Sequence, residues 1–135
     1  MNTRAEQGLI GNEKIENDIR MLQQEPSGEM LSVVLTSVRR RAQKGGQMIV
    51  PVELGENGKL QVAIMQVEKE KWLCAFTGFE QQLKGKSQVM STFLANISQL
   101  LDLALSQEVE GLIINPWDLT LRLDKNLIRI IKGEK

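Results

Sequence analysis

The stretch GLIINPWDLTLRL, residues 111–123, constrains the fold more than any other part of this chain. An apolar run that begins near residue 109 stops at an Asn-Pro pair, and apolar residues then resume in strict alternation over 119–123. A continuous apolar run is typical of a strand buried on both faces, whereas alternation indicates a strand with one face in the core. We therefore expect two strands, 109–116 and 119–123, joined by a turn that contains Asn115, Pro116, Trp117 and Asp118.

The region before residue 46 has the pattern of two neighbouring helices. Asn12 can cap a first helix, which Pro26 ends because proline disfavours the α conformation of the preceding residue. Ser27 can cap a second helix, which the pair Gly45-Gly46 closes. Residues 1–11 contain two glycines and no sustained periodicity, so we expect a flexible leader there.

A β-hairpin should follow these helices. Residues 47–54 and 60–68 are extended runs, and Asn57-Gly58 between them favours a type I′ turn, in which both central residues have positive φ. Pro51 has no N–H to donate to a ladder. We therefore expect its strand to lie at a sheet edge or to be irregular there.

The remaining patterns complete an α+β fold. The apolar run of residues 72–77 predicts a strand buried on both faces. With the other elements this gives a mixed sheet of about five or six strands packed with helices, in a single domain over 12–135. The other elements expected are one or two helical turns within 78–87, a short strand at 89–93, a helix over 96–107, and a last helix that Asp124 can cap.

Composition narrows the possible chemistry. The chain has 135 residues, no histidine and one cysteine, so most zinc sites and most histidine-dependent catalysis are excluded. Seventeen basic residues balance seventeen acidic residues, and no run is long and apolar enough for a membrane span. We therefore expect a cytoplasmic protein with no cofactor, no metal, no nucleic-acid partner and no membrane association.

Three further residues or clusters are interpreted as structural. Arg39-Arg40-Arg41 is the densest basic cluster, but no aromatic stacking platform accompanies it, so a solvated helix end is favoured over a nucleic-acid site. Cys74 lies inside an apolar strand and should be an inert buried thiol. Trp72, at the start of that strand, should lie in the core or at its rim.

The order of elements in the second half resembles the N-terminal domain of the SseB family, bacterial proteins named after enhanced serine sensitivity. The resemblance extends over roughly residues 13–131, with one departure at Trp117-Asp118, where many relatives have small or glycine-rich residues. It implies the same α+β fold but no catalytic residues, because the family name records a phenotype. The segments that carry it are MIVPVEL (48–54), CAFTGFEQQL (74–83), SQVMSTFLANISQLLDLAL (87–105) and VEGLIINPWDLTLRLDKNLIRII (109–131).

Two interpretations of the joint at residues 115–118 stay open at this level. Asn115 and Asp118 can bond nearby backbone groups while Pro116 fixes φ, which is good turn chemistry. A turn does not require tryptophan, however, and Trp117 is a residue type enriched at interface hot spots. We therefore predict a non-catalytic module that binds a protein partner or self-associates through Asn115, Pro116, Trp117 and Asp118. The alternatives are a small-molecule-sensing regulatory domain, with a pocket between the sheet and the helix of 96–107, and an enzyme based on carboxylates or lysine.

Overall fold

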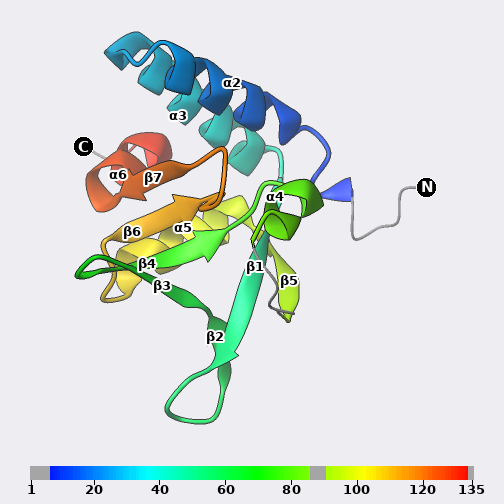
Figure 1. The fold of residues 1–135 in the computed structure, drawn as a ribbon, viewed down its shortest axis with the longest axis vertical. Helices are drawn as coiled ribbons and strands as arrows, with labels where there is room; N and C mark the ends of the chain where they lie inside the picture. The colour runs from blue at the N-terminus through cyan, green and yellow to red at the C-terminus, as the bar shows by residue number, and fades with distance from the viewer. Residues whose placement is uncertain (1–6, 86–90, 134–135) are drawn as a thin grey trace.

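Helices pack with two sheets in which most neighbouring strands are antiparallel, which confirms the predicted α+β fold class. The computed structural model describes residues 7–85 and 91–133, and Figure 1 shows the arrangement of its elements. No helix within these ranges is both long and apolar enough to cross a membrane. The elements are α2 (Glu13–Gln24), α3 (Gly28–Gln43), β1 (Gln47–Leu54), β2 (Leu60–Val62), β3 (Ile64–Val67), β4 (Glu70–Ala75), α4 (Phe79–Leu83), β5 (Thr92–Asn96), α5 (Ile97–Ser106), β6 (Gly111–Ile114), β7 (Leu121–Asp124) and α6 (Lys125–Lys132).

The strands form two sheets instead of the single predicted sheet of five or six strands. One sheet has three strands in the order β2-β1-β5, and the other has four in the order β3-β4-β6-β7. The second sheet is mixed, because β4 and β6 are parallel while β3 and β7 run antiparallel to their neighbours. An antiparallel bridge joins the sheets where the backbones of Ile49 and Phe76 exchange hydrogen bonds of 2.9 and 2.8 Å.

Pro51 explains why the predicted strand 60–68 is divided between the two sheets. β1 pairs with β2 from Val52 to Leu54, and the next pair in that register would be Pro51 with Ala63. Ala63 N–H donates to the Pro51 carbonyl at 2.8 Å, but Pro51 has no N–H to return the bond. The ladder stops there, and the chain continues into β3 of the other sheet. Of the two outcomes predicted for this strand, the edge position is wrong, because β1 lies between β2 and β5, whereas the irregularity at Pro51 is confirmed.

The β1–β2 hairpin is confirmed, but its turn differs from the predicted type I′ turn. Gly58 has a φ of 76°, whereas Asn57 is not among the residues with positive φ. Five residues, 55–59, connect the strands, and Lys59 N–H donates to Asn57 Oδ1 at 3.0 Å. A two-residue type I′ turn would need a positive φ at Asn57. In the longer loop this is not required, and the hydrogen bond to the Asn57 side chain helps to close the turn.

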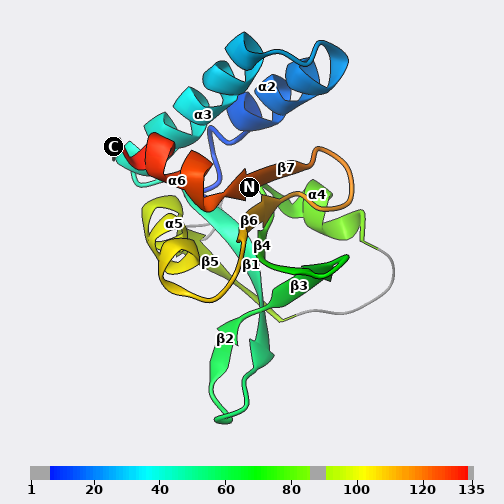
Figure 2. The same ribbon diagram turned by 90° about the vertical axis from the view of Figure 1, so that its left-hand side faces the viewer.

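The main core lies between the sheets and the helices. Buried residues of α2, α3, α5 and α6 pack against one face of the four-stranded sheet and against β1. Figures 1 and 2 show the pair α2 and α3 at one end of the molecule and the β1–β2 hairpin at the opposite end. Ser27 and Asp124 cap α3 and α6 as predicted, because each side-chain oxygen accepts from a backbone N–H three residues later, at 3.0 and 2.9 Å.

The segment before α2 differs from the flexible leader expected over 1–11. Residues 1–6 lie outside the described part, but 8–11 form turns in which Leu9 is buried and the Gly8 carbonyl accepts from Gln47 N–H at 2.8 Å. Asn12 does not cap α2 with its side chain. Its amide instead donates to the carbonyls of Gln47 and Thr77 at 2.8 and 3.0 Å. The caps at Ser27 and Asp124 are hydrogen bonds within three residues, whereas Asn12 bonds backbone groups that are distant in sequence.

A second apolar cluster covers the other face of the four-stranded sheet. It contains Leu9, Ile49, Trp72, Cys74, Phe76 and Ile113. Trp72 through Ala75 are all buried, so the prediction of a strand covered on both faces is confirmed. Trp72 is 5% exposed, in agreement with the predicted core position, and the Arg122 guanidinium lies 6.0 Å from its ring centre.

Candidate functional site

The joint between β6 and β7 contains all four of the predicted site residues and divides them into two pairs. Asn115 is fully buried and Pro116 is partly buried. Trp117 is 45% exposed, and the Asp118 side chain is also exposed. The first pair therefore belongs to the interior, and the second pair belongs to the surface.

Asn115 fixes the joint through long-range hydrogen bonds. It has a φ of 52°, a left-handed conformation that asparagine tolerates better than most residues. Its Oδ1 accepts from Thr77 N–H at 2.9 Å, and its Nδ2 donates to Thr77 Oγ1 at 3.0 Å. The Thr77 hydroxyl in turn donates to Glu16 Oε2 at 2.5 Å. The joint is thereby tied to the end of β4 and to α2.

Asp118 contacts Gln81 of α4 and Lys84, the residue that follows this helix. Lys84 Nζ lies 2.6 Å from Asp118 Oδ2, and Gln81 Nε2 donates to the same oxygen at 3.5 Å. The hydrogen bond from Lys84 is the main cause that lowers the pKa of Asp118 below its ordinary value, with Gln81 second. Because the carboxylate is in solvent, this pair positions α4 more than it stabilises the fold.

The prediction that the side chains of Asn115 and Asp118 bond nearby backbone groups of the turn is therefore wrong. Both side chains bond groups more than thirty residues away in sequence, and neither side chain bonds the backbone of the turn itself. The turn is closed instead by Thr120, whose hydroxyl donates to the Asn115 carbonyl at 2.8 Å. Thr77, Gln81 and Glu16 were not found by sequence reasoning, because short polar contacts between distant segments leave no periodic signal.

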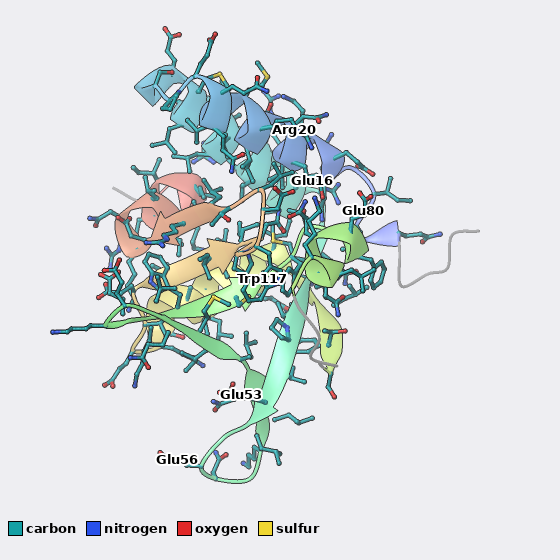
Figure 3. The ribbon with its side chains drawn as sticks, viewed as in Figure 1. Glu16, Arg20, Glu53, Glu56, Glu80 and Trp117 are labelled. Carbon is teal, nitrogen blue, oxygen red and sulfur yellow. The ribbon has the colours of Figure 1, made fainter. Side chains whose placement is uncertain are left out.

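Trp117 lies against Gly85, which follows α4. A Cβ atom at position 85 would lie only 2.7 Å from Cε2 of the indole, so the ring occupies the space that any larger residue would need. Figure 3 shows Trp117 beside α4. The indole thus has one face against the chain while nearly half of its surface is open to solvent.

Two apolar side chains of α4 are also exposed, on a different face of the helix from the side chains that contact Asp118. Phe79 is 47% exposed and Leu83 is 78% exposed. They are four residues apart on the helix and so share one of its faces. We refer to Trp117, together with the ion pair of Lys84 and Asp118 that borders it, as the joint patch.

A hollow of about 290 Å³ lies at the start of α4, between this helix, the start of α2 and the segment before it. Apolar residues line part of it, and its other lining residues include the three glutamates Glu13, Glu16 and Glu80. Figure 3 shows that Glu16 of α2 and Glu80 of α4 come close together although they are distant in sequence. Its apolar lining residues are Leu9, Ile10 and Phe79.

The space between the sheet and α5, expected as a pocket in the small-molecule interpretation, is filled. Ile97, Leu100, Leu101 and Ala104 of α5 are all buried in the main core. A hollow of about 220 Å³ lies instead where α5 meets the C-terminal parts of α3 and α6.

The basic cluster of α3 contacts the protein itself. Arg39 Nε donates to the Ile131 carbonyl at 2.7 Å, and Arg41 Nη2 donates to the Gly8 carbonyl at 2.9 Å. Arg40 is exposed. Two of the three guanidinium groups therefore serve as ties between α3, α6 and the segment before α2.

Cys74 is buried, and burial raises the pKa of its thiol to about 12. The thiol therefore stays protonated at neutral pH, in agreement with the predicted inert role. Among the residues that the structure describes, no three or more aspartate, glutamate or cysteine side chains gather in a way that could hold a metal ion.

Comparisons of the chain with protein-family models, with curated proteins and with solved structures found no match. The site is therefore interpreted from its own geometry. It combines a buried, fixed turn with an exposed aromatic ring, and this arrangement is suited to contact with another molecule.

Proposed function

We propose that this chain is an SseB-like, non-catalytic domain of the cytoplasm that binds another protein through the joint patch. The observation that carries the proposal is the position of Trp117, which is 45% exposed yet packed against Gly85. A large apolar ring that is already ordered loses little conformational entropy on binding, so more of its contact energy appears as affinity.

The surroundings of Trp117 support a binding role. Phe79 and Leu83, on another face of α4, are also exposed apolar side chains, and the ion pair of Lys84 and Asp118 gives Trp117 a charged border. An apolar centre with a polar rim is the usual anatomy of a protein interface. Asn115 holds the turn that carries the ring, which makes the surface rigid.

Replacing Trp117 with alanine should weaken partner binding by about 2 kcal/mol or more, roughly thirty-fold in Kd, because aromatic anchors are the residues most often found as hot spots. The measurement is affinity capture from native cytosol with quantitative mass spectrometry, followed by a titration of the captured protein. Stability should change little, because the ring is already half in solvent.

Ile130→Ala is the matched control for this experiment. Ile130 is 56% exposed on α6, so the substitution removes a similar amount of exposed apolar surface at a position away from the joint patch. A partner that both variants retain, or that both lose, would count against a site at Trp117.

A second candidate function, small-molecule sensing without turnover, is favoured by the hollow beside α4. Three carboxylates and three apolar side chains line its 290 Å³, which suits a small organic cation. A thermal-shift screen of amines distinguishes the two functions, because a ligand that binds only the folded state must raise Tm. An amine that raises Tm of the wild type but not of Glu16→Gln would favour sensing over protein binding.

A further inference from the structure

The hairpin formed by β2 and the end of β1 projects from the body of the protein. Both views show this arm extending away from the helices, at the end of the molecule opposite α2 and α3 (Figures 1 and 2). Glu53 and Glu56 mark its outer part in Figure 3. An isolated two-stranded hairpin is marginally stable in water, so an arm of this kind gains stability from a covering surface.

Strand register shows that the arm has one apolar face. Residues that oppose each other across a ladder point to the same face of the sheet, and so do residues two apart along a strand. Val52 opposes Val62, and Leu54 opposes Leu60. All four side chains therefore lie on one face, whereas Glu53 and its partner Gln61 lie on the other.

The apolar face is the continuation of the main core into solvent. Val50 and Val62 belong to the core, and Phe93 of β5 opposes Val50 and so extends the same face. Toward the tip of the arm, exposure rises from 0% at Val50 and 8% at Val62 to 71% at both Leu54 and Leu60, and Phe93 beside Val50 is 45% exposed. The face of the sheet that packs in the core thus continues into the arm, where the helices no longer cover it.

Charge distribution identifies a second copy of this chain as a fitting occupant. In a two-fold contact the same patch meets itself, so any charged residue on it would approach its own copy. Among the residues that the structure describes, the face made by Val52, Leu54, Leu60 and Phe93 has no charged residue, because Glu53 points to the opposite face. The whole chain has equal numbers of basic and acidic residues, so net charge does not oppose association.

We propose that two copies of this chain associate through the apolar faces of their β1–β2 arms, which we call the arm face. Two leucines and one phenylalanine are a small part of a standard interface, which buries about 800 Å² per partner. The dimer should therefore be weak and concentration-dependent, with a Kd in the micromolar range or above. The arm face is separate from the joint patch, so this inference does not depend on the proposed function.

Sedimentation equilibrium of the full chain, from low micromolar to near-millimolar concentration, tests the proposal. We expect a reversible monomer–dimer equilibrium in the wild type. Leu60→Glu should raise the dimer Kd at least tenfold, because each copy would bring a charge into the apolar contact. Leu60 is 71% exposed, so the variant should keep the Tm of the wild type.

Ile130→Glu is the control, because it puts the same charge on an exposed apolar position of α6 and should leave the equilibrium unchanged. A wild type that stays monomeric at the highest concentration overturns the proposal. A dimer that Leu60→Glu does not weaken, or that both variants weaken equally, also overturns it. Binding of the arm to another protein or to a lipid vesicle, without self-association, would assign the face to a different occupant.

Discussion

Replacing Phe76 with alanine should reduce the free energy of unfolding by about 3–5 kcal/mol, the usual cost of removing a buried phenylalanine. Phe76 is fully buried in the second apolar cluster, and its backbone forms the bridge to Ile49 that joins the two sheets. The loss is large relative to a total stability of roughly 5–15 kcal/mol, because the cavity would open where the sheets meet. Urea denaturation followed by tryptophan fluorescence gives the value.

Phe79→Ala provides a matched comparison three residues further along the chain. The substitution is chemically identical, but Phe79 is 47% exposed at the start of α4. We expect a loss of stability of about 1 kcal/mol or less, since little buried area is removed. Equal losses for the two variants would show that the bridge region is not the packed junction described above.

Replacing Asn115 with alanine should reduce the free energy of unfolding by about 2–4 kcal/mol. The change leaves the buried N–H of Thr77 without an acceptor, which costs about 1–3 kcal/mol. It also places an alanine at a φ of 52°, where a Cβ without a compensating side-chain hydrogen bond costs about 1 kcal/mol or more. Thermal and urea denaturation should agree on the loss.

Asn115→Gly separates the two contributions. Glycine accepts the left-handed conformation without steric cost, but it removes the same hydrogen bonds to Thr77. We expect the glycine variant to be about 1 kcal/mol more stable than the alanine variant and still less stable than the wild type. If both variants matched the wild type, the hydrogen bonds between Asn115 and Thr77 would contribute nothing to the fold.

The candidate site was predictable only in part. The alternation after Asn-Pro correctly placed a turn between two strands, and the presence of tryptophan drew attention to its surface. The sequence could not show that Asn115 bonds Thr77 or that Asp118 pairs with Lys84, because these partners are 38 and 34 residues away. It also gave no sign that Phe79 and Leu83 of α4 would be exposed.

The errors in the predicted fold have a common physical origin. Asn12 is a typical helix-cap residue, but its side chain bonds the backbone of a neighbouring strand. Asn57 is typical of a tight turn, but in the longer loop its side chain accepts a hydrogen bond from a backbone N–H. Pro51 was correctly recognised as a break in a ladder. Its consequence, the division of one extended run between two sheets, depended on which strand opposed it.

The sequence by itself determined the order and type of most elements, because helix periodicity, the caps at Ser27 and Asp124, and the apolar run of β4 are local properties. Only the tertiary structure decided how many sheets form, which polar side chains meet, and which apolar residues stay uncovered. Leu54 and Leu60 show the reason. The same alternation that buries Val50 and Val62 continues into the arm, and only the extent of the helical layer leaves its last two leucines in solvent.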